Sequence, residues 1–330
     1  MMRLAFGPKR VFLRVLSALL LSAVLLSAPA QASTERDAAL YEAGMAAVSA
    51  CVTEDMTDVE KLTALHDWLA LHCDYGATRR CETAYGALVE HTANCVGYAE
   101  GYAYLARLAG LEGTVTYSEE LDHAWILATL DGVRYFSDCT WDDGKYEKLG
   151  LIRHRYWLFD GENAAAIGHY GWDSGEPVPG GALEYAPWGS AVTRVIFEGD
   201  YAYYIDDSFR LWRCDRGTWE TEILWRTEDR WPDTDPEDGK DPELYTSLIY
   251  FGGRLFFNTA RGVYSVDTEG REVRTVTEPE PDGDRCLYGI AVRDGLFCCS
   301  LADAPGALLY DIVNIAPVRN VWGESLWLFS

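Results

Sequence analysis

One cysteine of this 330-residue chain stands where a helix is expected to begin. Asn94 is a good N-cap residue, and small and aromatic side chains alternate from Cys95 to Gly110, whose residue type suits the left-handed end of a helix. At the first turn, the sulfur lies near the positive end of the backbone dipole, which favours the thiolate, and free N–H groups there can stabilise an oxyanion. Cys95 is therefore a candidate nucleophile.

His123 and Asp138 lie on a predicted β-hairpin at residues 123–140, which has the two-residue turn signal Asp131-Gly132, and Asp142 follows two residues beyond it. A tight turn places Asp138 and Asp142 on the same sheet face as His123, on opposite diagonals. Diagonal neighbours are about 7–8 Å apart at the backbone, so either carboxylate can reach the imidazole. The pattern predicts that His123 is a general base held by one of these aspartates, and register alone does not choose between them.

The surrounding segments predict the elements that position these residues. Thr57 and Glu60 form a capping-box pattern before apolar residues at helical spacing, and Thr83 can cap a short helix that ends near residue 89. Strands are expected at residues 113–118, 123–130, 133–140 and 156–159. Helices followed by an antiparallel sheet are typical of an α+β domain.

The chain changes character after a glycine- and proline-containing stretch at residues 175–181. Apolar-aromatic strand pairs, each followed by a further strand-like segment, recur with a period of about 41 to 54 residues. The pairs occupy residues 195–205, 248–258 and 288–300, and the further segments centre on Trp212, Tyr264 and Tyr310. Three such units are fewer than the roughly four to eight blades of a propeller, so we predict an all-β region that is either propeller-like or sandwich-like.

Three separated motifs resemble the bacterial transglutaminase-like superfamily. In that family a cysteine opens a helix that reads Cys-x-Gly-Tyr-Ala, a histidine stands in His-Ala-Trp, and an aspartate stands shortly before Thr-Trp-Asp. The matching residues are Cys95, His123 and Asp138, so the resemblance implies a Cys-His-Asp catalytic triad and favours Asp138 over Asp142. It covers residues 83–143 and extends weakly through residues 155–173, where family members often carry a strand and then a histidine, here His169. It implies a papain/transglutaminase-like fold with acyl transfer through a thioester. No cofactor is expected, and the sequence has no metal-ligand spacing.

The N-terminal residues have the pattern of a signal peptide. Four basic residues (Arg3, Lys9, Arg10 and Arg14) precede an apolar run of about a dozen residues, and Ala30-Gln31-Ala32 is a suitable cleavage site. The run is shorter than the roughly 20 residues needed to span a bilayer, so we expect a secreted or extracytoplasmic protein without a membrane span. The expected parts are a signal peptide at residues 1–32, a transglutaminase-like catalytic domain at 33–174, a linker at 175–184 and a β-rich domain at 185–330.

The composition excludes some partners. The net charge is −24, and it becomes about −28 when the four basic residues of the leader are removed. Such a surface repels nucleic acid and anionic lipid.

The chain has nine cysteines, an odd number that leaves at least one thiol outside any disulfide. If Cys95 is that thiol, the other cysteines can form up to four bridges, whose pairing is not readable from sequence. Cys298 and Cys299 are adjacent in a strand-like run, so their side chains should face opposite ways.

Other residues near these motifs are interpreted as structural. The histidines expected to be structural or surface residues are His66, His72, His91 and His169. Gly97 and Gly101 are expected to let their helix approach the sheet closely. Trp125 and Trp141 are expected to pack beside the cleft, and Tyr85 or Trp141 is an alternative oxyanion donor.

These residues predict an exported cysteine-dependent acyl-transfer enzyme, a transglutaminase-like cysteine protease or amidase. Hydrolysis of a peptide or amide bond in a protein or peptide substrate is the favoured reaction, with cell-wall or host-derived material as candidate substrates. The alternative reaction is amine transfer to protein glutamine, in which an amine takes the acyl group of the glutamine side chain. The alternative class is a non-catalytic binding protein with a vestigial triad, whose β-rich half recognises carbohydrate or protein.

Overall fold

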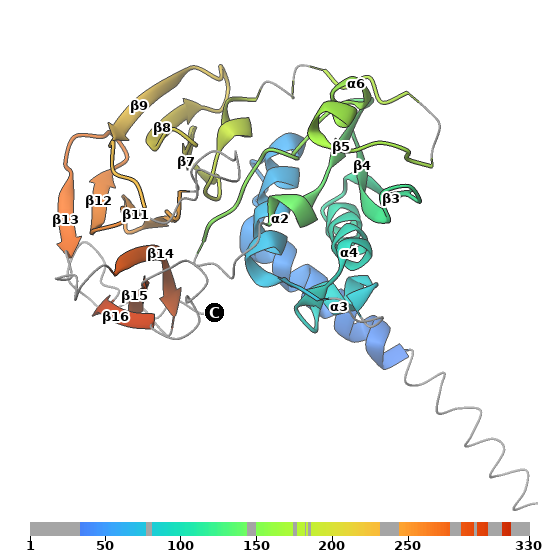
Figure 1. The fold of residues 1–330 in the computed structure, drawn as a ribbon, viewed down its shortest axis with the longest axis horizontal. Helices are drawn as coiled ribbons and strands as arrows, with labels where there is room; N and C mark the ends of the chain where they lie inside the picture. Colours follow the sequence, from blue (N-terminus) through green and yellow to red (C-terminus); the bar gives the residue numbers. More distant parts are fainter. Residues whose placement is uncertain are drawn as a thin grey trace, which may run out of the picture.

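A computed structural model describes residues 34–76, 81–143, 150–173, 177–181, 183, 186–231, 244–277, 285–293, 296–302 and 312–317. Helices, a three-stranded sheet and a pair of short strands form the described N-terminal half, and further sheets form the C-terminal half beside it (Figure 1). The predicted signal peptide at residues 1–32 lies outside the described residues. Within the described ranges, no helix has the length and apolar character that crossing a bilayer requires.

The helices of the N-terminal half begin where the sequence places capping residues. The capping box of Thr57 and Glu60 is confirmed, since Glu60 N donates to Thr57 Oγ1 at 3.4 Å and Thr57 N donates to Glu60 Oε2 at 2.8 Å. A helix over residues 34–51 precedes the others, which are α2 (Asp58–His72), α3 (Ala84–Leu88), α4 (Cys95–Leu108), α5 (Cys139–Asp142), α6 (Gly161–Ala164) and the 3₁₀ segments η2 (Ala165–Ile167) and η4 (Pro187–Ser190). Two short parallel strands, β1 (Asp74–Tyr75) and β2 (Thr92–Ala93), join the segments before α3 and α4.

The main sheet of this half is antiparallel, in the order β3 (Glu112–Ser118), β4 (His123–Leu130) and β5 (Val133–Ser137). Leu130 pairs with Val133, so the tight turn and its register are confirmed. The predicted strand at residues 133–140 is too long, because β5 ends at Ser137 and Asp138 caps α5.

The predicted strand at residues 156–159 is wrong. Leu158 has a φ of 46°, in the left-handed region, which bends the chain out of an extended conformation. Phe159 still makes an isolated bridge to Phe136 of β5, so the segment runs along the sheet edge without becoming a strand.

Helix α4 is the centre of the N-terminal half. It packs against α2, α3, β3 and β4, and the rings of Tyr98 and Tyr102 are fully buried. A Cβ on Gly97 would lie 1.9 Å from the carbonyl oxygen of Cys81, and one on Gly101 would lie 2.8 Å from Ala87 Cβ. Because these glycines have no side chain, the Cys81 segment and α3 can approach α4 closely. The prediction that the glycines face the sheet is wrong.

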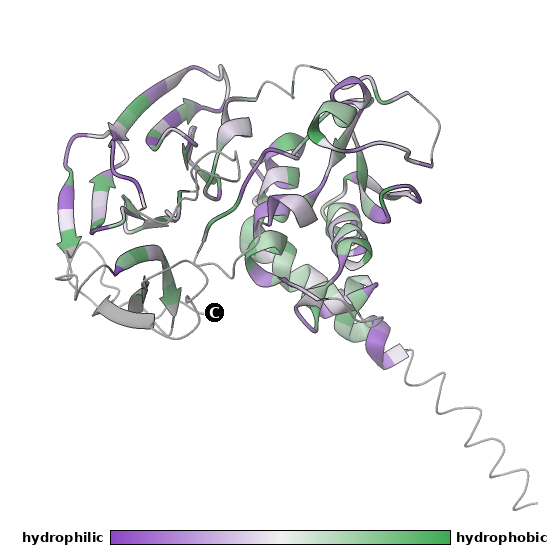
Figure 2. Ribbon diagram, in the orientation of Figure 1, coloured by the Kyte–Doolittle hydropathy of each residue, from purple (hydrophilic) through white to green (hydrophobic). Residues whose placement is uncertain are grey.

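Among its described residues, the C-terminal half contains three antiparallel sheets, each of which follows the chain order. They contain β6 (Ile196–Glu198), β7 (Tyr201–Ile205), β8 (Arg210–Asp215) and β9 (Thr221–Arg226); β10 (Leu248–Phe251), β11 (Arg254–Asn258), β12 (Val263–Asp267) and β13 (Arg274–Thr277); and β14 (Cys286–Arg293), β15 (Leu296–Ala302) and β16 (Ile312–Pro317). Hydrophilic and hydrophobic residues are both present along β9 (Figure 2), where the adjacent apolar residues Ile223 and Leu224 lie between more hydrophilic ones.

The α+β region followed by an all-β region is confirmed. The strand pairs predicted near residues 195–205, 248–258 and 288–300 are present, while the fourth strands β9 and β13 were not predicted. The segment centred on Tyr310 lies outside the described residues. A propeller-like or sandwich-like arrangement of the three sheets stays a prediction.

The two halves share buried contacts. Leu62 and Leu65 of α2 belong to the same apolar cluster as Trp188 and Val195, which lie beyond the predicted linker. Arg216, after β8, binds Glu60 through two hydrogen bonds, Nε to Oε1 at 2.7 Å and Nη2 to Oε2 at 2.8 Å. Buried packing therefore continues across the predicted linker. The domain boundaries at residues 174 and 185 stay a prediction.

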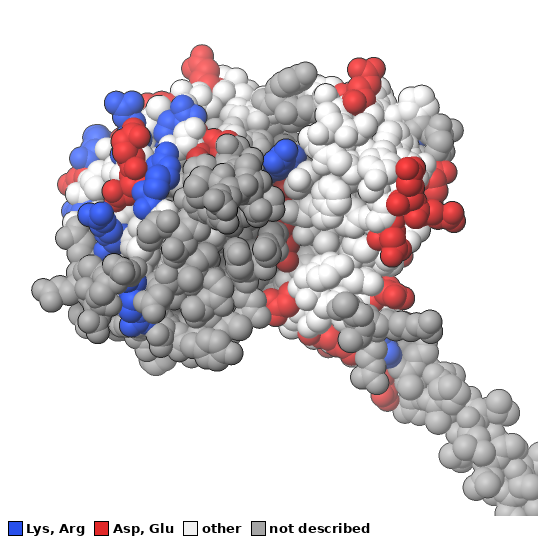
Figure 3. Space-filling view, viewed as in Figure 1, with Lys and Arg blue, Asp and Glu red and all other residues white. Residues whose placement is uncertain are grey.

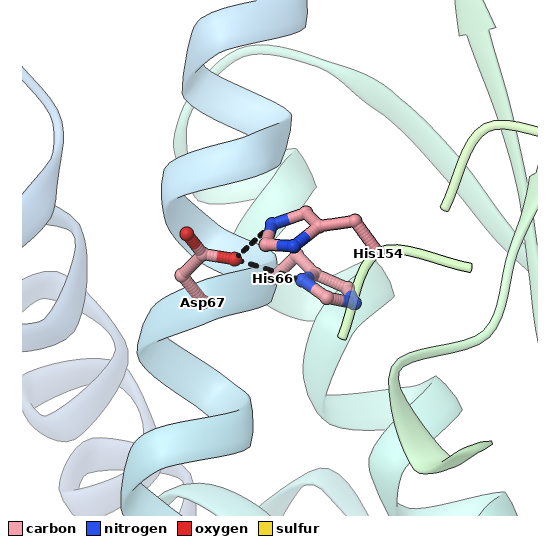
Figure 4. Close-up of side chains that lie close together, drawn as sticks. All are labelled: His66, Asp67 and His154. Atoms are coloured by element: carbon pink, nitrogen blue, oxygen red, sulfur yellow. Dashed lines mark hydrogen bonds and ion pairs between the residues drawn. The ribbon is translucent and has the colours of Figure 1, made fainter. Parts of the chain in front are cut away.

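A buried carboxylate on α2 adds polar contacts to this junction (Figure 4). Asp67 Oδ1 lies 3.0 Å from His66 Nδ1 and 2.8 Å from His154 Nε2, and Asp67 Oδ2 accepts a 2.7 Å hydrogen bond from the backbone N–H of Val195. Contacts with Asp142 and Asp67 outweigh burial and raise the pKa of His66 to about 9. At neutral pH the junction therefore contains a buried ion pair.

We expect Asp67→Asn to lower the free energy of unfolding by about 3–5 kcal/mol, because it removes one of the two carboxylates that stabilise the buried His66 imidazolium and leaves only Asp142. Urea unfolding of the full chain at pH 7 measures this loss. Asp58→Asn is the matched control on the same helix, since Asp58 forms an exposed pair with Lys61 at 2.9 Å and should contribute less than about 1 kcal/mol. Similar losses in the two variants would contradict the structural role of Asp67.

A second prediction concerns the start of α4. Gly97→Ala should lower the free energy of unfolding by about 1–3 kcal/mol, because the added methyl group overlaps the Cys81 carbonyl and the backbone must move. Gly189→Ala is the control, since a Cβ there has no neighbour within 4 Å. Equal urea midpoints for the two variants would show that the close approach at Gly97 is not required.

Candidate active site

Cys95 is the first residue of α4. The side chain of Asn94 caps this helix by accepting a 3.1 Å hydrogen bond from the backbone N–H of Gly97, as the sequence predicts. Cys95 is a free thiol and is 8% exposed. The thiol is thus held beside the N–H groups of a helix start.

His123 is the first residue of β4 and pairs with Ser118 of β3. The preceding residue, Asp122, has a φ of 49°, and its backbone oxygen lies 4.0 Å from the sulfur of Cys95. The hydroxyl of Tyr117 donates to Asp122 Oδ1, which fixes this unusual backbone conformation from the side chain. The turn between β3 and β4 therefore carries the imidazole to the start of α4.

Asp138 lies where β5 ends, and its carboxylate has two tasks. Its Oδ1 accepts hydrogen bonds from the backbone N–H groups of Thr140 and Trp141, at 3.0 and 3.3 Å, and so caps α5. Its Oδ2 lies 2.6 Å from His123 Nε2. The ring of Trp141 stacks on that of His123, with centroids 4.8 Å apart and planes 20° apart, so the imidazole is held at its edge and on its face.

The rival aspartate faces another histidine. Asp142 accepts hydrogen bonds from the backbone N–H of Tyr156 at 3.0 and 3.1 Å, and its Oδ2 lies 3.3 Å from His66 Nε2. If the strand had continued past Asp138, Asp142 would lie on the same sheet face as His123. Helix α5 forms instead, and Asp142 turns away from that face. Of the two aspartates, Asp138 is the one hydrogen-bonded to His123.

The electrostatics of the three residues favour a thiolate–imidazolium pair. Burial would lower the pKa of His123, but the contacts with Asp138 and Cys95 outweigh it and raise that pKa to about 9. Burial would raise the pKa of Cys95, but hydrogen bonding to His123 and to the backbone N–H of Ala124 lowers it below the ordinary thiol value. The pKa of Asp138 is also lowered, since hydrogen bonds from histidine outweigh its burial.

The structure adds a residue that the sequence did not single out for the site. His169, predicted to be a structural or surface residue, is fully buried, and its Nε2 lies 2.8 Å from the same Asp138 Oδ2 that binds His123. His154, another buried histidine, received no role from the sequence and belongs to the Asp67 junction. Neither residue has a local motif, because each reaches its aspartate across the fold.

Two His-Asp-His groups place ligand-type atoms close together. They are His66, Asp67 and His154, and His123, Asp138 and His169. Their nitrogen–oxygen distances are 2.6–3.0 Å, which are hydrogen-bond distances. Two tetrahedral zinc ligands at about 2.0–2.1 Å from the ion lie roughly 3.3 Å apart, so these distances fit shared protons better than a shared ion.

Residues 46–138 match the family model of the Transglutaminase-like superfamily. Human Kyphoscoliosis peptidase is 29% identical over an alignment of 122 residues, with a coverage of 31% of this chain and 18% of that protein. The mouse protein of the same name is 27% identical over an alignment of 117 residues, with a coverage of 29% of this chain and 18% of that protein. A solved structure described as a TGase is 17% identical, and the match covers 32% of this chain and 32% of that chain with a TM-score of 0.28. The chain spans less than a fifth of the length of these curated relatives. It carries a transglutaminase-like domain, followed by a β-rich region outside the match.

Selective alkylation tests the electrostatics of Cys95. Burial raises the pKa values of Cys51 and Cys73 to about 12, whereas that of Cys95 is lowered. We therefore expect brief treatment with iodoacetamide at pH 6 to label Cys95 first, as measured by peptide mapping in a mass spectrometer.

The matched control is His123→Ala, which removes the imidazolium that favours the thiolate. Labelling of Cys95 in this variant should fall at pH 6 and recover near pH 9, where an ordinary thiol ionises. Undiminished labelling of the variant at pH 6 would show that His123 does not activate Cys95.

Proposed function

We propose that this protein is an exported cysteine-dependent enzyme that hydrolyses a peptide or amide bond in a protein or peptide. The observation that carries the proposal is the contact of His123 with Asp138 at 2.6 Å, beside a Cys95 thiol whose pKa is lowered at the start of α4. This combination supplies a nucleophile, a proton carrier and a group that orients the carrier.

The proposed reaction has two halves. The thiolate of Cys95 attacks the carbonyl carbon, and the electron pair of the C=O bond moves to oxygen, near the N–H groups at the start of α4. When the C–N bond breaks, the His123 imidazolium gives its proton to the leaving amine, and a thioester remains on Cys95. His123 then takes a proton from water, the hydroxide attacks the thioester, and the acid product leaves as the thiolate returns.

Asp138 supports both halves without exchanging a proton. Its carboxylate binds His123 at Nε2, which leaves Nδ1 as the nitrogen that faces the thiol and the leaving amine. Because the pKa of Asp138 is lowered, it stays ionised and stabilises the imidazolium. Tyr85 and Trp141 remain candidate oxyanion donors alongside the helix start.

The substrate and location are inferred from the surface and the N-terminal pattern. The signal peptide pattern at residues 1–32 supports export, which brings cell-wall and host-derived proteins within reach. On the face in Figure 3, acidic side chains lie along the outer edge of the N-terminal half, and both signs of charge are interspersed on the β-rich half. This distribution and the net charge of −24 argue against nucleic acid as a partner.

Amine transfer to protein glutamine and a vestigial triad are the alternatives. Incubation of the full chain with unfolded casein and a fluorescent primary amine separates them, since hydrolysis yields fragments and amine transfer yields labelled casein. Cys95→Ser must abolish either activity. Protein that is labelled at Cys95 by iodoacetamide but turns over neither casein nor small amides and esters would favour the binding protein.

The aspartate assignment gives a further prediction. We expect Asp138→Asn to slow the chemical step by about 10³–10⁴-fold, because the amide presents the wrong partner to His123 and removes the charge that stabilises the imidazolium. Turnover of a small amide or ester substrate, corrected for the folded fraction, measures the effect. Asp142→Asn is the matched control, and it should change stability more than turnover. Equal losses of turnover, or a greater loss in Asp142→Asn, would overturn the assignment.

A further inference from the structure

We propose that His169 is a positioning residue, which shares the carboxylate oxygen of Asp138 with His123 and thereby limits how strongly that carboxylate holds the charged form of His123. The inference rests on the proposed function, because it concerns the base of that reaction. It extends the Cys-His-Asp triad to a fourth residue that the cysteine does not contact.

The four hydrogen bonds of Asp138 carry the inference. Oδ1 accepts hydrogen bonds from the backbone N–H groups of Thr140 and Trp141. Oδ2 lies 2.6 Å from His123 Nε2 and 2.8 Å from His169 Nε2. The carboxylate is 1% exposed and His169 is 0% exposed. The oxygen that orients the base is therefore shared between two imidazoles at a buried position.

The fold holds His169 rigidly against this oxygen. Gly168, with a φ of 96°, turns the chain after η2, and the backbone N–H of His169 donates to the carbonyl of Ala164 at 2.8 Å. Four aromatic rings lie around the imidazole at centroid distances of 4.3–5.4 Å; they belong to Trp125, Trp141, Tyr156 and Phe159. The ring cannot leave Asp138 without displacing these neighbours.

The hydrogen-bond pattern assigns the protons. An ionised carboxylate only accepts hydrogen bonds, so His169 donates through Nε2–H. Its Nδ1 is buried and has no hydrogen-bond partner among the described residues, so a charged ring would leave an N–H unpaired there, which is costly. The titratable groups that face the ring are Asp138, His123 at a centroid distance of 5.9 Å and Tyr156. His169 therefore acts as a neutral donor.

A neutral donor on Asp138 has a consequence for catalysis. Each hydrogen bond to a carboxylate withdraws negative charge from it, so loss of His169 should make Asp138 bind the His123 imidazolium more tightly. His123 must give its proton to the leaving amine, and an imidazolium that is held too tightly is a weak general acid. The shared oxygen thus keeps the base strong enough to activate Cys95 and weak enough to release the proton.

The test uses the pH dependence of Cys95 alkylation by iodoacetate in the full chain, which needs no substrate. This anion is attracted by the His123 imidazolium beside the thiolate, so its rate falls when that ring loses its proton. His169→Phe keeps a ring among the aromatic neighbours and removes the donor. We expect the alkaline limb, where the imidazolium loses its proton, to move up by about 0.5–1 pH unit. His169→Gln, whose amide N–H can replace Nε2–H, should return the limb to the wild-type position.

His154→Phe is the matched control, because it removes a buried histidine from Asp67 rather than from Asp138. It should lower stability and leave the alkaline limb unchanged. A limb in His169→Phe that stays in place or moves down overturns the inference, and so does an equal shift in His154→Phe. If the wild-type protein itself shows no alkaline limb, the proposed function fails instead.

A measurement on the wild-type protein keeps the inference testable if His169→Phe does not fold. Histidine ring ¹⁵N chemical shifts at pH 7, assigned with the His169→Gln variant, should show His169 neutral and protonated at Nε2, and His123 protonated at both nitrogens. A doubly protonated His169 at this pH would overturn its role as a neutral donor.

Discussion

The hydrogen bond between Asp138 and His123 is the contact on which the candidate site depends. Asp138 stands at the point where β5 becomes α5, so its carboxylate ends a strand, caps a helix and binds the base at once. A buried carboxylate is stable only when its oxygens are paired, and here each oxygen has two donors. The position of His123 is therefore coupled to the folding of β4, β5, α5 and the segment that carries His169.

The same arrangement occurs a second time in the chain. Asp67 has one oxygen between His66 and His154 and the other on the backbone N–H of Val195, as Asp138 has one oxygen between two histidines and the other on backbone N–H groups. The Asp67 group joins α2 to the β-rich half, whereas the Asp138 group lies at the nucleophile. Asp142 connects the two regions, since it lies on the helix that Asp138 caps and faces His66.

Differences in thiol ionisation give the site its chemical selectivity. Burial raises the pKa of Cys51, Cys73, Cys139, Cys214 and Cys299, whereas at Cys95 the contacts with His123 and with backbone N–H groups outweigh burial. The thioester chemistry that we propose needs this contrast, because the thiolate is the attacking species. The β-rich half packs on α2, and the groups that set the pKa of Cys95 lie outside it, so its proposed contribution is binding surface and stability.

The sequence determined the features that depend on neighbouring residues. The capping residues Thr57 and Asn94 predicted where α2 and α4 begin, and Asp131-Gly132 predicted the register of β4 and β5, because caps and tight turns are local hydrogen-bond patterns. The motifs around Cys95, His123 and Asp138 predicted which residues would come together and favoured Asp138 over Asp142. The tertiary structure decided what depends on distant contacts: the end of β5 at Ser137, the left-handed Leu158, the packing of Trp188 and Val195 on α2, and the contact of His169 with Asp138. Strand propensity extended through residue 140, but the backbone N–H groups of Thr140 and Trp141 found a better acceptor in Asp138, and only the assembled fold brings a histidine 31 positions further on to the other oxygen of that carboxylate.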